Sequence, residues 1–402
     1  MAAARPILMR VSGADRPGIT AGLMEVLSAS EADVHDVEQM VIRGRLTLDV
    51  VFSVPEGPSS VKDLLFFGWE QGLDVDFDSI EETPRRHRRG MVVVTIIAPR
   101  IGPAAFGAIA EAVAESGGNI DRIERLSRYP VVSYELTVVG GDLDEIRTRL
   151  GKAASEQSVD VAVQERSLER RTKRLVVVDV DSTLIQDEVI NLLAEEAGVL
   201  DEVEKITMSA MEGAMDFGDS LTHRVALLKD LDIEGIERVV ERVTLTPGAR
   251  TFVRTLKRAG MRTAMISGGF TIVADAIGAD LGVDHVVANE LEIVEGRVTG
   301  QLTGRIVDRG RKAEIVGELA EAEGIPLDQV VAIGDGANDI DMLAVAGLGI
   351  AFNAKPVVRE VADTAVNVPY LDAILFMLGV HREDVEDADD PEPVQIEGLP
   401  PV

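Results

Sequence analysis

The chain has 402 residues, no cysteine and a formal net charge of −30, with 46% hydrophobic and 27% charged residues. This composition is that of a globular protein long enough for two or three domains. The lack of cysteine excludes disulfides and cysteine-based zinc or nucleophile sites, as expected in a reducing compartment. No secretory signal pattern and no membrane-spanning apolar run is present, so we expect a cytoplasmic protein with no membrane partner.

Two short segments are rich in arginine, Arg85–Arg89 and Arg166–Arg174. They are the only candidates for a nucleic-acid contact, because the large negative charge of the whole chain repels phosphates. Both are interpreted as solvated linkers, and we expect no nucleic-acid partner. By the same reasoning, a site for a phosphorylated substrate must supply its own local positive charge.

The first part of the chain contains an internal repeat of roughly 80 residues. In the first copy, a strand pattern at Ile7–Val11 precedes an Asp-Arg-Pro-Gly-Ile loop, a helical pattern and strand patterns that begin at Asp33 and Arg45. The second copy begins at Met91–Ala98 and has the same order. The single tryptophan, Trp69, lies in the first copy and is expected in its core.

The repeat resembles a tandem pair of ACT domains, ferredoxin-like modules that in many enzymes bind an amino acid and report it to a catalytic domain. The Asp-Arg-Pro-Gly-Ile loop matches that family, whereas the second copy has Ile101-Gly102-Pro103 there. A glycine such as Gly18 lets backbone amides approach a ligand carboxylate at a helix N-terminus. A Pro-Gly turn that only starts a helix is the alternative. The resemblance implies a homodimer formed through these domains and an L-serine site near Asp15, Gly18, Gly107 and Asn119.

The second part is organised around an apolar run, Leu175–Val178, that ends in Asp179 and Asp181. A continuous β-branched run is typical of a strand in a parallel sheet covered on both faces. If the backbone stays extended, both carboxylates point to one side, at the carboxyl edge where α/β sheets bind ligands. Oxygen ligands at this spacing favour a hard cation, Mg²⁺. Taken alone, the segment could also be a strand that stops in a capped turn.

After Arg174, strand patterns alternate with helical ones, which predicts a doubly wound parallel sheet. Residues 187–246 show helical periodicity without a clear strand, and we expect them to form a cap over the carboxyl edge. Leu291–Gly304, with Glu295-Gly296 at its turn, predicts a β-hairpin. Residues 383–402 are acidic and rich in proline, and we expect them to be disordered.

Three later segments carry residues that complement the two aspartates. Ser267-Gly268-Gly269 follows a strand pattern and offers a hydroxyl and backbone amides that can bind an anion. Lys312 lies on a helical stretch, and another apolar strand ends in the run Gly334–Asp339. Separately they could be a turn, a surface lysine and a glycine-rich loop. Together, in this order, they resemble the four motifs of the haloacid dehalogenase superfamily.

The resemblance implies a phosphatase mechanism with one Mg²⁺ per site. Asp179 is the expected nucleophile, which forms an aspartyl-phosphate, and Asp181 the general acid and then base. Lys312 and Mg²⁺ neutralise the phosphoryl charge. The expected metal ligands are Asp179, Asp335 and the backbone carbonyl of Asp181, with Asp339 ordering the surrounding water.

Within the superfamily, residues of the cap resemble the substrate-binding pattern of the phosphoserine phosphatase family, and the likeness covers about residues 173–378. It implies that Glu188 binds the ammonium of O-phospho-L-serine and Arg224 its carboxylate. Met211 and Phe217 are expected to close over the apolar part of the substrate. The full expected set of substrate contacts is Glu188, Met211, Phe217, Arg224, Ser267, Gly268, Lys312 and Asn338.

The predicted fold class is therefore α/β, a Rossmann-like doubly wound parallel sheet with a helical cap, preceded by two ferredoxin-like ACT α+β domains. The expected domains are residues 1–86, 87–168 and 169–382, followed by the tail. The predicted reaction is Mg²⁺-dependent hydrolysis of O-phospho-L-serine, the last step of serine biosynthesis, regulated by L-serine. Two alternatives stay open: a phosphatase of the same superfamily for another small phosphate monoester, and an amino-acid-sensing binding protein with an inactive hydrolase domain.

Overall fold

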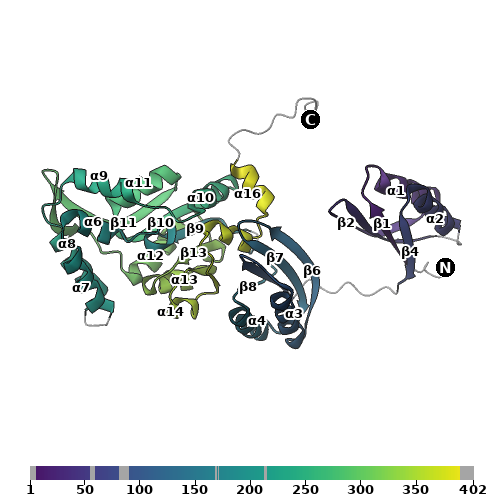
Figure 1. Ribbon diagram of the computed structural model, residues 1–402, viewed down its shortest axis with the longest axis horizontal. Coiled ribbons are helices and arrows are strands. Elements are labelled where there is room, and N and C mark those ends of the chain that lie inside the picture. Colours follow the sequence, from purple (N-terminus) through teal and green to yellow (C-terminus); the bar gives the residue numbers. More distant parts are fainter. Residues whose placement is uncertain are drawn as a thin grey trace, which may run out of the picture. The chain divides into compact units, whose positions relative to one another are not determined.

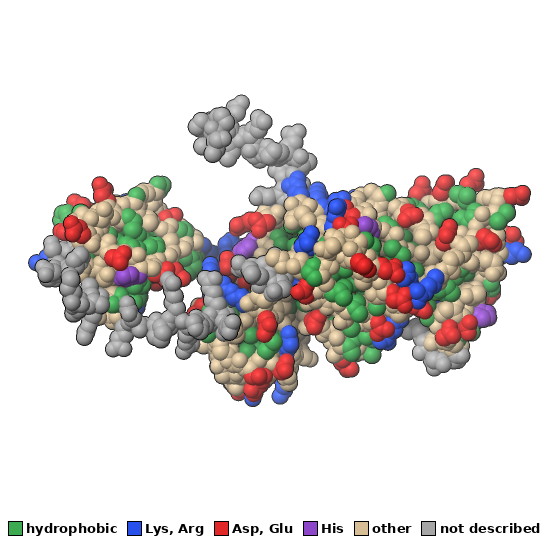
Figure 2. Space-filling view, turned by 180° about the vertical axis from the view of Figure 1, so that it is seen from behind, with side chains coloured by type: hydrophobic (Ala, Val, Ile, Leu, Met, Phe, Trp, Pro, Cys, Tyr) green, Lys and Arg blue, Asp and Glu red, His purple; other side chains and the backbone are tan. Residues whose placement is uncertain are grey.

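The computed structural model describes residues 6–54, 59–80, 90–167, 170, 172–211 and 215–389 (Figure 1). The chain divides into two units, residues 1–88 and 89–402, each with its own hydrophobic core. Acidic side chains are visible on the surface of both units, in keeping with the net charge of −30 (Figure 2). The domain boundaries predicted at residues 86 and 168 lie outside the described residues. Within the described ranges, no helix combines the length and the apolar character needed to cross a lipid bilayer.

The first unit has the element order of a ferredoxin-like domain. Its strands and helices are β1 (Ile7–Ala14), α1 (Ile19–Ala29), β2 (Asp33–Ile42), β3 (Arg45–Ser53), α2 (Ser59–Gln71) and β4 (Asp74–Ser79). They form one antiparallel sheet in the order β2-β3-β1-β4. The expectation for Trp69 is wrong, because its side chain is 74% exposed on α2 while Leu64 of the same helix fills the core.

The second unit begins with the other copy of the repeat. Its elements are β5 (Met91–Ala98), α3 (Pro103–Glu115), β6 (Gly118–Ser127), β7 (Val132–Gly140), α4 (Leu143–Gln157) and β8 (Asp160–Glu165), in the sheet order β6-β7-β5-β8. Val94 and Ile96 pack with α3 and α4, whereas Ile97 and Ala162 belong to the core of the following domain. Because this sheet is covered on both faces, β5 is almost continuously buried.

Polar contacts also connect this copy to the larger sheet. Asp160 of β8 accepts hydrogen bonds from the backbone N–H and the side-chain amide of Asn367, at 2.7 and 2.6 Å. The Gln164 side chain donates to the Met377 carbonyl oxygen at 3.1 Å. A partly buried ion pair of 2.6 Å joins Arg170, in the linker, to Glu135 of β7. The second ACT-like copy is therefore fixed directly to the domain that follows it.

The larger sheet has seven strands in the order β12-β11-β10-β9-β13-β14-β15. Their bounds are β9 (Leu175–Asp179), β10 (Arg262–Phe270), β11 (His285–Val294), β12 (Arg297–Thr303), β13 (Val330–Gly334), β14 (Leu348–Phe352) and β15 (Thr364–Val366). All neighbours pair in parallel except β12, which forms an antiparallel hairpin with β11. The predicted hairpin turn is confirmed, with Glu295 and Gly296 at φ 49° and 76°.

Helices cover both faces of this sheet, as the sequence predicted. Alternate residues of β9 point to opposite faces: Val176 and Val178 pack with α10 (Ala249–Arg258) and α11 (Thr271–Leu281). Leu175 and Val177 pack with α12 (Arg309–Ala322), α13 (Ile340–Val345) and α14 (Pro356–Arg359). The buried apolar strand is thus the centre of a three-layer domain (Figure 1).

The cap contains four helices in its described part, with no strand there. They are α6 (Val189–Ala197), α7 (Leu200–Met211), α8 (Phe217–Leu227) and α9 (Ile233–Arg242). The β11–β12 hairpin supports them, because Ile233 donates its N–H to Gly296 at 3.1 Å and Val298 donates to Leu231 at 2.9 Å. The hairpin and the cap helices lie at the same end of the domain (Figure 1).

The end of the chain corrects one prediction. Residues 383–389 were expected to be disordered, but they belong to the helix α16 (Arg382–Asp389). Val385 is fully buried in the core that also includes α10, and Arg382 lies 3.4 Å from the Asp372 carboxylate. Val385 and the contact between Arg382 and Asp372 therefore help to anchor an otherwise acidic helix. The rest of the predicted tail, residues 390–402, lies outside the described residues.

Candidate active site

The candidate site lies where three neighbouring strands end. β10, β9 and β13 are adjacent and parallel, so their carboxyl ends meet at one edge of the sheet. Asp179 is the last residue of β9, Asp335 follows β13 directly, and Ser267 lies near the end of β10. Residues separated by more than 150 positions are brought to this edge by sheet topology.

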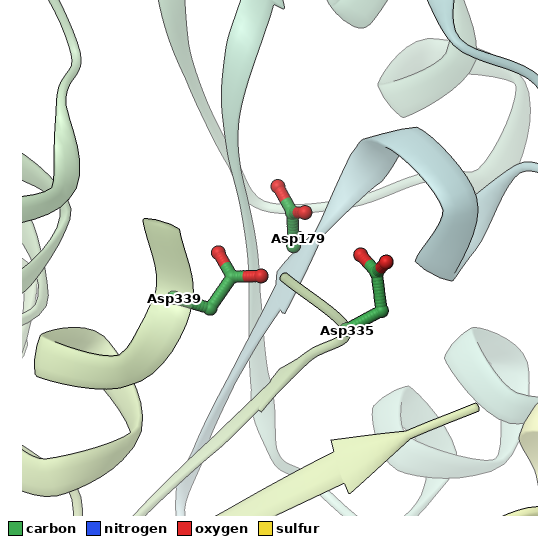
Figure 3. Close-up of side chains that lie close together, drawn as sticks. All are labelled: Asp179, Asp335 and Asp339. Carbon is green, nitrogen blue, oxygen red and sulfur yellow. The ribbon is translucent and has the colours of Figure 1, made fainter. Parts of the chain in front are cut away.

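Three carboxylates form the centre of the site. One oxygen atom from each of Asp179, Asp335 and Asp339 lies within 4.8 Å of the others, and the side chains point toward a common space (Figure 3). Asp339 is held in this position because its carboxylate also accepts a hydrogen bond from the Gly336 N–H, at 3.0 Å. A donor set made only of carboxylate oxygens could hold a hard cation.

Lys312 is the positive charge that the sequence required. Lys312 lies near the start of α12. Its amine donates to Asp179 Oδ1 at 2.5 Å and to Asp339 Oδ1 at 2.7 Å, and the side chain is 1% exposed. Burial lowers the pKa of Lys312, but the carboxylates of Asp179 and Asp339 outweigh it and raise the pKa above its ordinary value. Lys312 is therefore a permanent ammonium.

One ammonium does not balance this many carboxylates. Burial and the Asp339 carboxylate raise the pKa of Asp179 well above its usual range, although Lys312 opposes the shift. Burial, Asp339 and Glu188 raise the pKa of Asp335 to about 6. Anions crowded in a buried site favour either protonation or a bound cation. The raised pKa values and the all-carboxylate donor set thus both indicate a site suited to a bound cation.

Asp181 occupies a separate position beside the cluster. Its Oδ1 accepts the Val189 N–H at 2.7 Å, and its Oδ2 accepts the Ser267 hydroxyl at 3.1 Å. A turn at Ser182, with φ 56°, redirects the chain immediately after it. Burial, followed by the Glu188 carboxylate, raises the pKa of Asp181 to about 6. A carboxyl group of this pKa exchanges a proton close to neutral pH.

The cap places both charges of the predicted substrate pattern near Asp181. Glu188 is exposed and accepts the Ser182 hydroxyl at 2.9 Å. Arg224 on α8 is partly buried, which lowers its pKa, while the carboxylates of Glu188 and Asp181 raise it. An exposed anion and a guanidinium therefore lie within electrostatic range of each other and of Asp181.

Phe217, the first residue of α8, places an apolar ring beside the loop that contains Ser267 and Gly268. A Cβ added to Gly268 would lie 3.2 Å from the Phe217 ring, so the ring packs closely against the backbone at this glycine. Gly268 stands directly after Ser267 in the bulged end of β10. The backbone at Gly268 and the ring of Phe217 thus face each other across the sheet edge.

Family comparisons agree with this geometry. Residues 176–344 match the haloacid dehalogenase-like hydrolase family, and residues 5–78 and 91–164 each match an ACT domain family. A phosphoserine phosphatase of Streptomyces coelicolor is 51% identical over 386 residues, which cover 95% of this chain and 94% of that protein. The chain belongs to the phosphoserine phosphatase family.

Other relatives match most of the length of this chain or share its fold. A phosphoserine phosphatase of Mycobacterium tuberculosis is 46% identical, with 95% of each chain covered. The crystal structure of a probable phosphoserine phosphatase from Vibrio cholerae has a TM-score of 0.60 at 33% identity, over 75% of this chain and 88% of that one. A haloacid dehalogenase family hydrolase from Salmonella enterica has a TM-score of 0.64 at 28% identity, over 71% and 98%. The predicted fold class is confirmed.

The site residues predicted from the sequence lie in different parts of the structure: most meet at the sheet edge, and the regulatory candidates do not. Asp179, Asp181, Ser267, Lys312, Asp335 and Asp339 meet at the sheet edge, with Asn338 in the same loop. The side chain of Met211, at the end of α7, lies outside the described part. The proposed regulatory residues lie elsewhere: Asp15 and Gly18 precede α1 in the first unit, and Gly107 on α3 and Asn119 on β6 belong to the second.

Two polar residues that contact this site, Thr183 and Asn289, were not predicted from the sequence. Thr183 donates its hydroxyl to Asp335 Oδ1 at 3.2 Å. Asn289 on β11 is 3% exposed and hydrogen-bonded to the backbone at Gly268. The available signals were a hydroxyl inside the first motif and an amide directly after the apolar run Val286–Ala288. Neither signal identifies its partner, which only the fold supplies.

Proposed function

We propose that this protein hydrolyses O-phospho-L-serine to L-serine and inorganic phosphate, the last step of serine biosynthesis. One observation carries the proposal: Glu188 and Arg224 lie within electrostatic range of Asp181, which itself contacts Ser267. A substrate with a phosphate, an ammonium and a carboxylate needs an anion and a guanidinium at a short distance from the phosphoryl site. A sugar phosphate needs neither.

In the first step, an Asp179 carboxylate oxygen attacks phosphorus and the bond between phosphorus and the seryl oxygen breaks. Asp181 gives its proton to that oxygen as it leaves, so L-serine is released and Asp179 carries the phosphoryl group. Lys312, 2.5 Å from Asp179 Oδ1, orients the nucleophile and neutralises negative charge. Ser267 and the Gly268 N–H would hold phosphoryl oxygens, each such donor contributing about 3 kcal/mol in the transition state.

In the second step, water attacks the phosphorus of the aspartyl-phosphate. Asp181, now a carboxylate, takes a proton from this water, and the bond between phosphorus and Asp179 breaks to release phosphate. Phe217 and the cap helices exclude other water molecules from the site, which limits side reactions of the phosphoryl group. The same residue therefore acts as acid and then as base, and the enzyme returns to its starting state.

The substrate preference is testable with the unmodified protein. We expect kcat/KM for phosphate release to be at least about 100-fold higher with O-phospho-L-serine than with glucose 6-phosphate, because the charge pair of the cap contributes about 3 kcal/mol. Phosphate release by a colorimetric assay measures both. A ratio near one would support the alternative, a phosphatase for another small monoester. Absence of turnover with any phosphate would support a binding protein with an inactive hydrolase domain.

We propose Mg²⁺ as the cofactor, held by the carboxylates of Asp179 and Asp335 and the backbone carbonyl of Asp181. The all-oxygen donor set and the crowding of buried carboxylates support this choice. When bound, the ion supplies charge neutralisation for the transferring phosphoryl group. The carboxylate of Asp339 lies in the same group, although Lys312 also binds it.

Mg²⁺ should raise the thermal unfolding midpoint of EDTA-treated protein, because a ligand at 100 times its Kd stabilises the folded state by about 2.7 kcal/mol. Asp335→Asn should lose most of this shift. Asp341→Asn is the matched control, since Asp341 follows two residues after Asp339 but pairs with Arg309 at 2.5 Å at the surface. A full Mg²⁺ shift in the Asp335 variant would show that Asp335 is not a ligand.

We further propose that the ACT domains bind L-serine and that the protein is a homodimer through them. The support is the loop before α1, where Gly18 has φ 96° and a Cβ added there would face open space, with no atom beyond its chain neighbours within 4 Å. Such a loop exposes backbone N–H groups to a ligand carboxylate. Sedimentation or light scattering of the full chain measures the oligomeric state.

Gly18→Ala should weaken the response of the enzyme to L-serine by about tenfold or more, because hydrogen bonds to a charged carboxylate contribute about 1.5–3 kcal/mol each. The measurement is activity against L-serine concentration. Gly324→Ala serves as control: this residue also has a positive φ, 63°, but it lies in the turn before β13. An unchanged serine response in the Gly18 variant would exclude the loop as the site.

A further inference from the structure

A buried amide lies behind the motif that would hold the phosphoryl group. The ladder between β10 and β11 pairs Ile266 with Val287 and then Phe270 with Asn289, and it is interrupted between these pairs. Ser267, Gly268 and Gly269 thus leave the regular ladder, which frees their backbone for other contacts. Asn289, 3% exposed, is the β11 residue at the end of this interruption.

Asn289 replaces the missing ladder contacts with its side chain. Its Nδ2 donates to the Gly268 carbonyl oxygen at 2.8 Å, and its Oδ1 accepts the Val307 N–H at 2.8 Å. The orientation of this amide is fixed by its partners, because a carbonyl only accepts and a backbone N–H only donates. Both polar ends of a buried side chain are therefore satisfied, each by a different segment of the active site.

The contact at Gly268 is transmitted to Asp181. The Gly268 carbonyl and the Gly269 N–H belong to one planar peptide group, so fixing one end fixes the other. The Gly269 N–H donates to Ser267 Oγ at 2.8 Å, and the Ser267 hydroxyl donates to Asp181 Oδ2 at 3.1 Å. The hydroxyl of Ser267 is thereby held in one rotamer by a chain of hydrogen bonds that begins at Asn289.

The contact at Val307 leads to Lys312. Val307 precedes Asp308, whose carboxylate caps α12 by accepting the Arg311 N–H at 2.8 Å and whose carbonyl accepts the Lys312 N–H at 2.9 Å. The first turn of the helix that carries Lys312 is therefore tied to β11 immediately before it begins. One side chain connects the two phosphate-binding segments of the site.

We propose that Asn289 is a positioning residue for phosphoryl transfer. It fixes the position of the Ser267-Gly268 loop relative to the start of α12. The proposal rests on the proposed function through the roles given to Ser267 and Lys312. Asn289 itself touches no substrate. Its effect is expected on the phosphoryl end of any substrate and not on the serine end.

The test uses Asn289→Asp and Asn289→Ala in the full-length protein, assayed with Mg²⁺ at pH 8 on O-phospho-L-serine and on p-nitrophenyl phosphate. Aspartate keeps the size and the acceptor but turns an oxygen toward the Gly268 carbonyl oxygen. Alanine leaves room for a water molecule that can donate to it. We expect kcat to fall by about 10- to 100-fold in the aspartate variant, less in the alanine variant, and equally on both substrates, with KM nearly unchanged.

Thr263→Val is the matched control, because Thr263 is a buried residue near the start of β10, the strand that carries Ser267, and its hydroxyl donates to Asp284 at 2.9 Å, at the opposite end of that strand. It should lower the unfolding midpoint and keep kcat. Three results would overturn the proposal: kcat within twofold of wild type in both Asn289 variants, an equal loss in Thr263→Val, or alanine slower than aspartate, which indicates space filling. If the aspartate variant does not fold, the alanine variant and the control decide. The aryl phosphate keeps the test valid even if O-phospho-L-serine is not the substrate.

Discussion

Asp179→Asn is expected to reduce phosphate release from O-phospho-L-serine by about 10⁴-fold or more, because the substitution removes the nucleophile and leaves only binding and charge stabilisation. Asparagine has the same shape and can still accept a hydrogen bond from Lys312, which lies 2.5 Å from Asp179 Oδ1. Initial rates with purified wild type and variant measure the effect.

The variant should also remain folded. The pKa of Asp179 is raised by burial and by Asp339, so the carboxylate is not in an environment that favours its charge. Removing that charge is therefore expected to leave the metal-free unfolding midpoint unchanged or higher. Asp187→Asn is the control, since Asp187 lies in the following loop and accepts the Thr244 N–H at 2.7 Å.

A second readout separates the nucleophile from a merely electrostatic residue. Acid quenching of wild type during turnover of ³²P-labelled substrate should leave label on the protein, since an aspartyl-phosphate is the proposed intermediate. The Asp179 variant should carry none. Near-normal activity in Asp179→Asn, or label retained on that variant, would assign the nucleophile to another residue.

Arg224→Ala is expected to lower kcat/KM for O-phospho-L-serine by about 100-fold or more, which corresponds to about 3 kcal/mol for a lost charge-assisted pair with the substrate carboxylate. p-Nitrophenyl phosphate has no carboxylate, so its kcat/KM should change by less than about threefold. The ratio of the two effects measures the role of Arg224 independently of any loss of active protein.

Two further variants make this result specific. Arg224→Lys keeps the charge but loses the planar fork, and should give an intermediate loss on O-phospho-L-serine. His223→Ala is the neighbouring control, because His223 is exposed and its ring bonds to the Asp219 carbonyl of its own helix at 2.7 Å. Equal losses on both substrates in Arg224→Ala would remove its proposed carboxylate-binding role.

Much of this architecture follows from local sequence patterns. The β-branched run Leu175–Val178 predicts a strand buried on both faces, and it is the centre of the seven-stranded sheet. The pair Glu295-Gly296 predicts the hairpin turn, because both positions need a positive φ. Where local pattern gave no long-range information, the predictions were wrong: Trp69 is exposed, and Val385 anchors a helix where disorder was expected.

The sequence by itself determined the residue types of the chemistry, their order along the chain and the family, because motifs are local and strand ends follow from hydrophobic pattern. Only the tertiary structure decided which groups touch. It placed Asp339 in the carboxylate group beside Asp179 and Asp335, gave Lys312 two partners, and connected Asn289 to the backbone behind Ser267. The physical reason is that contacts between residues about 20 to 150 positions apart depend on sheet order and on the interruption of β10. A one-dimensional pattern contains neither.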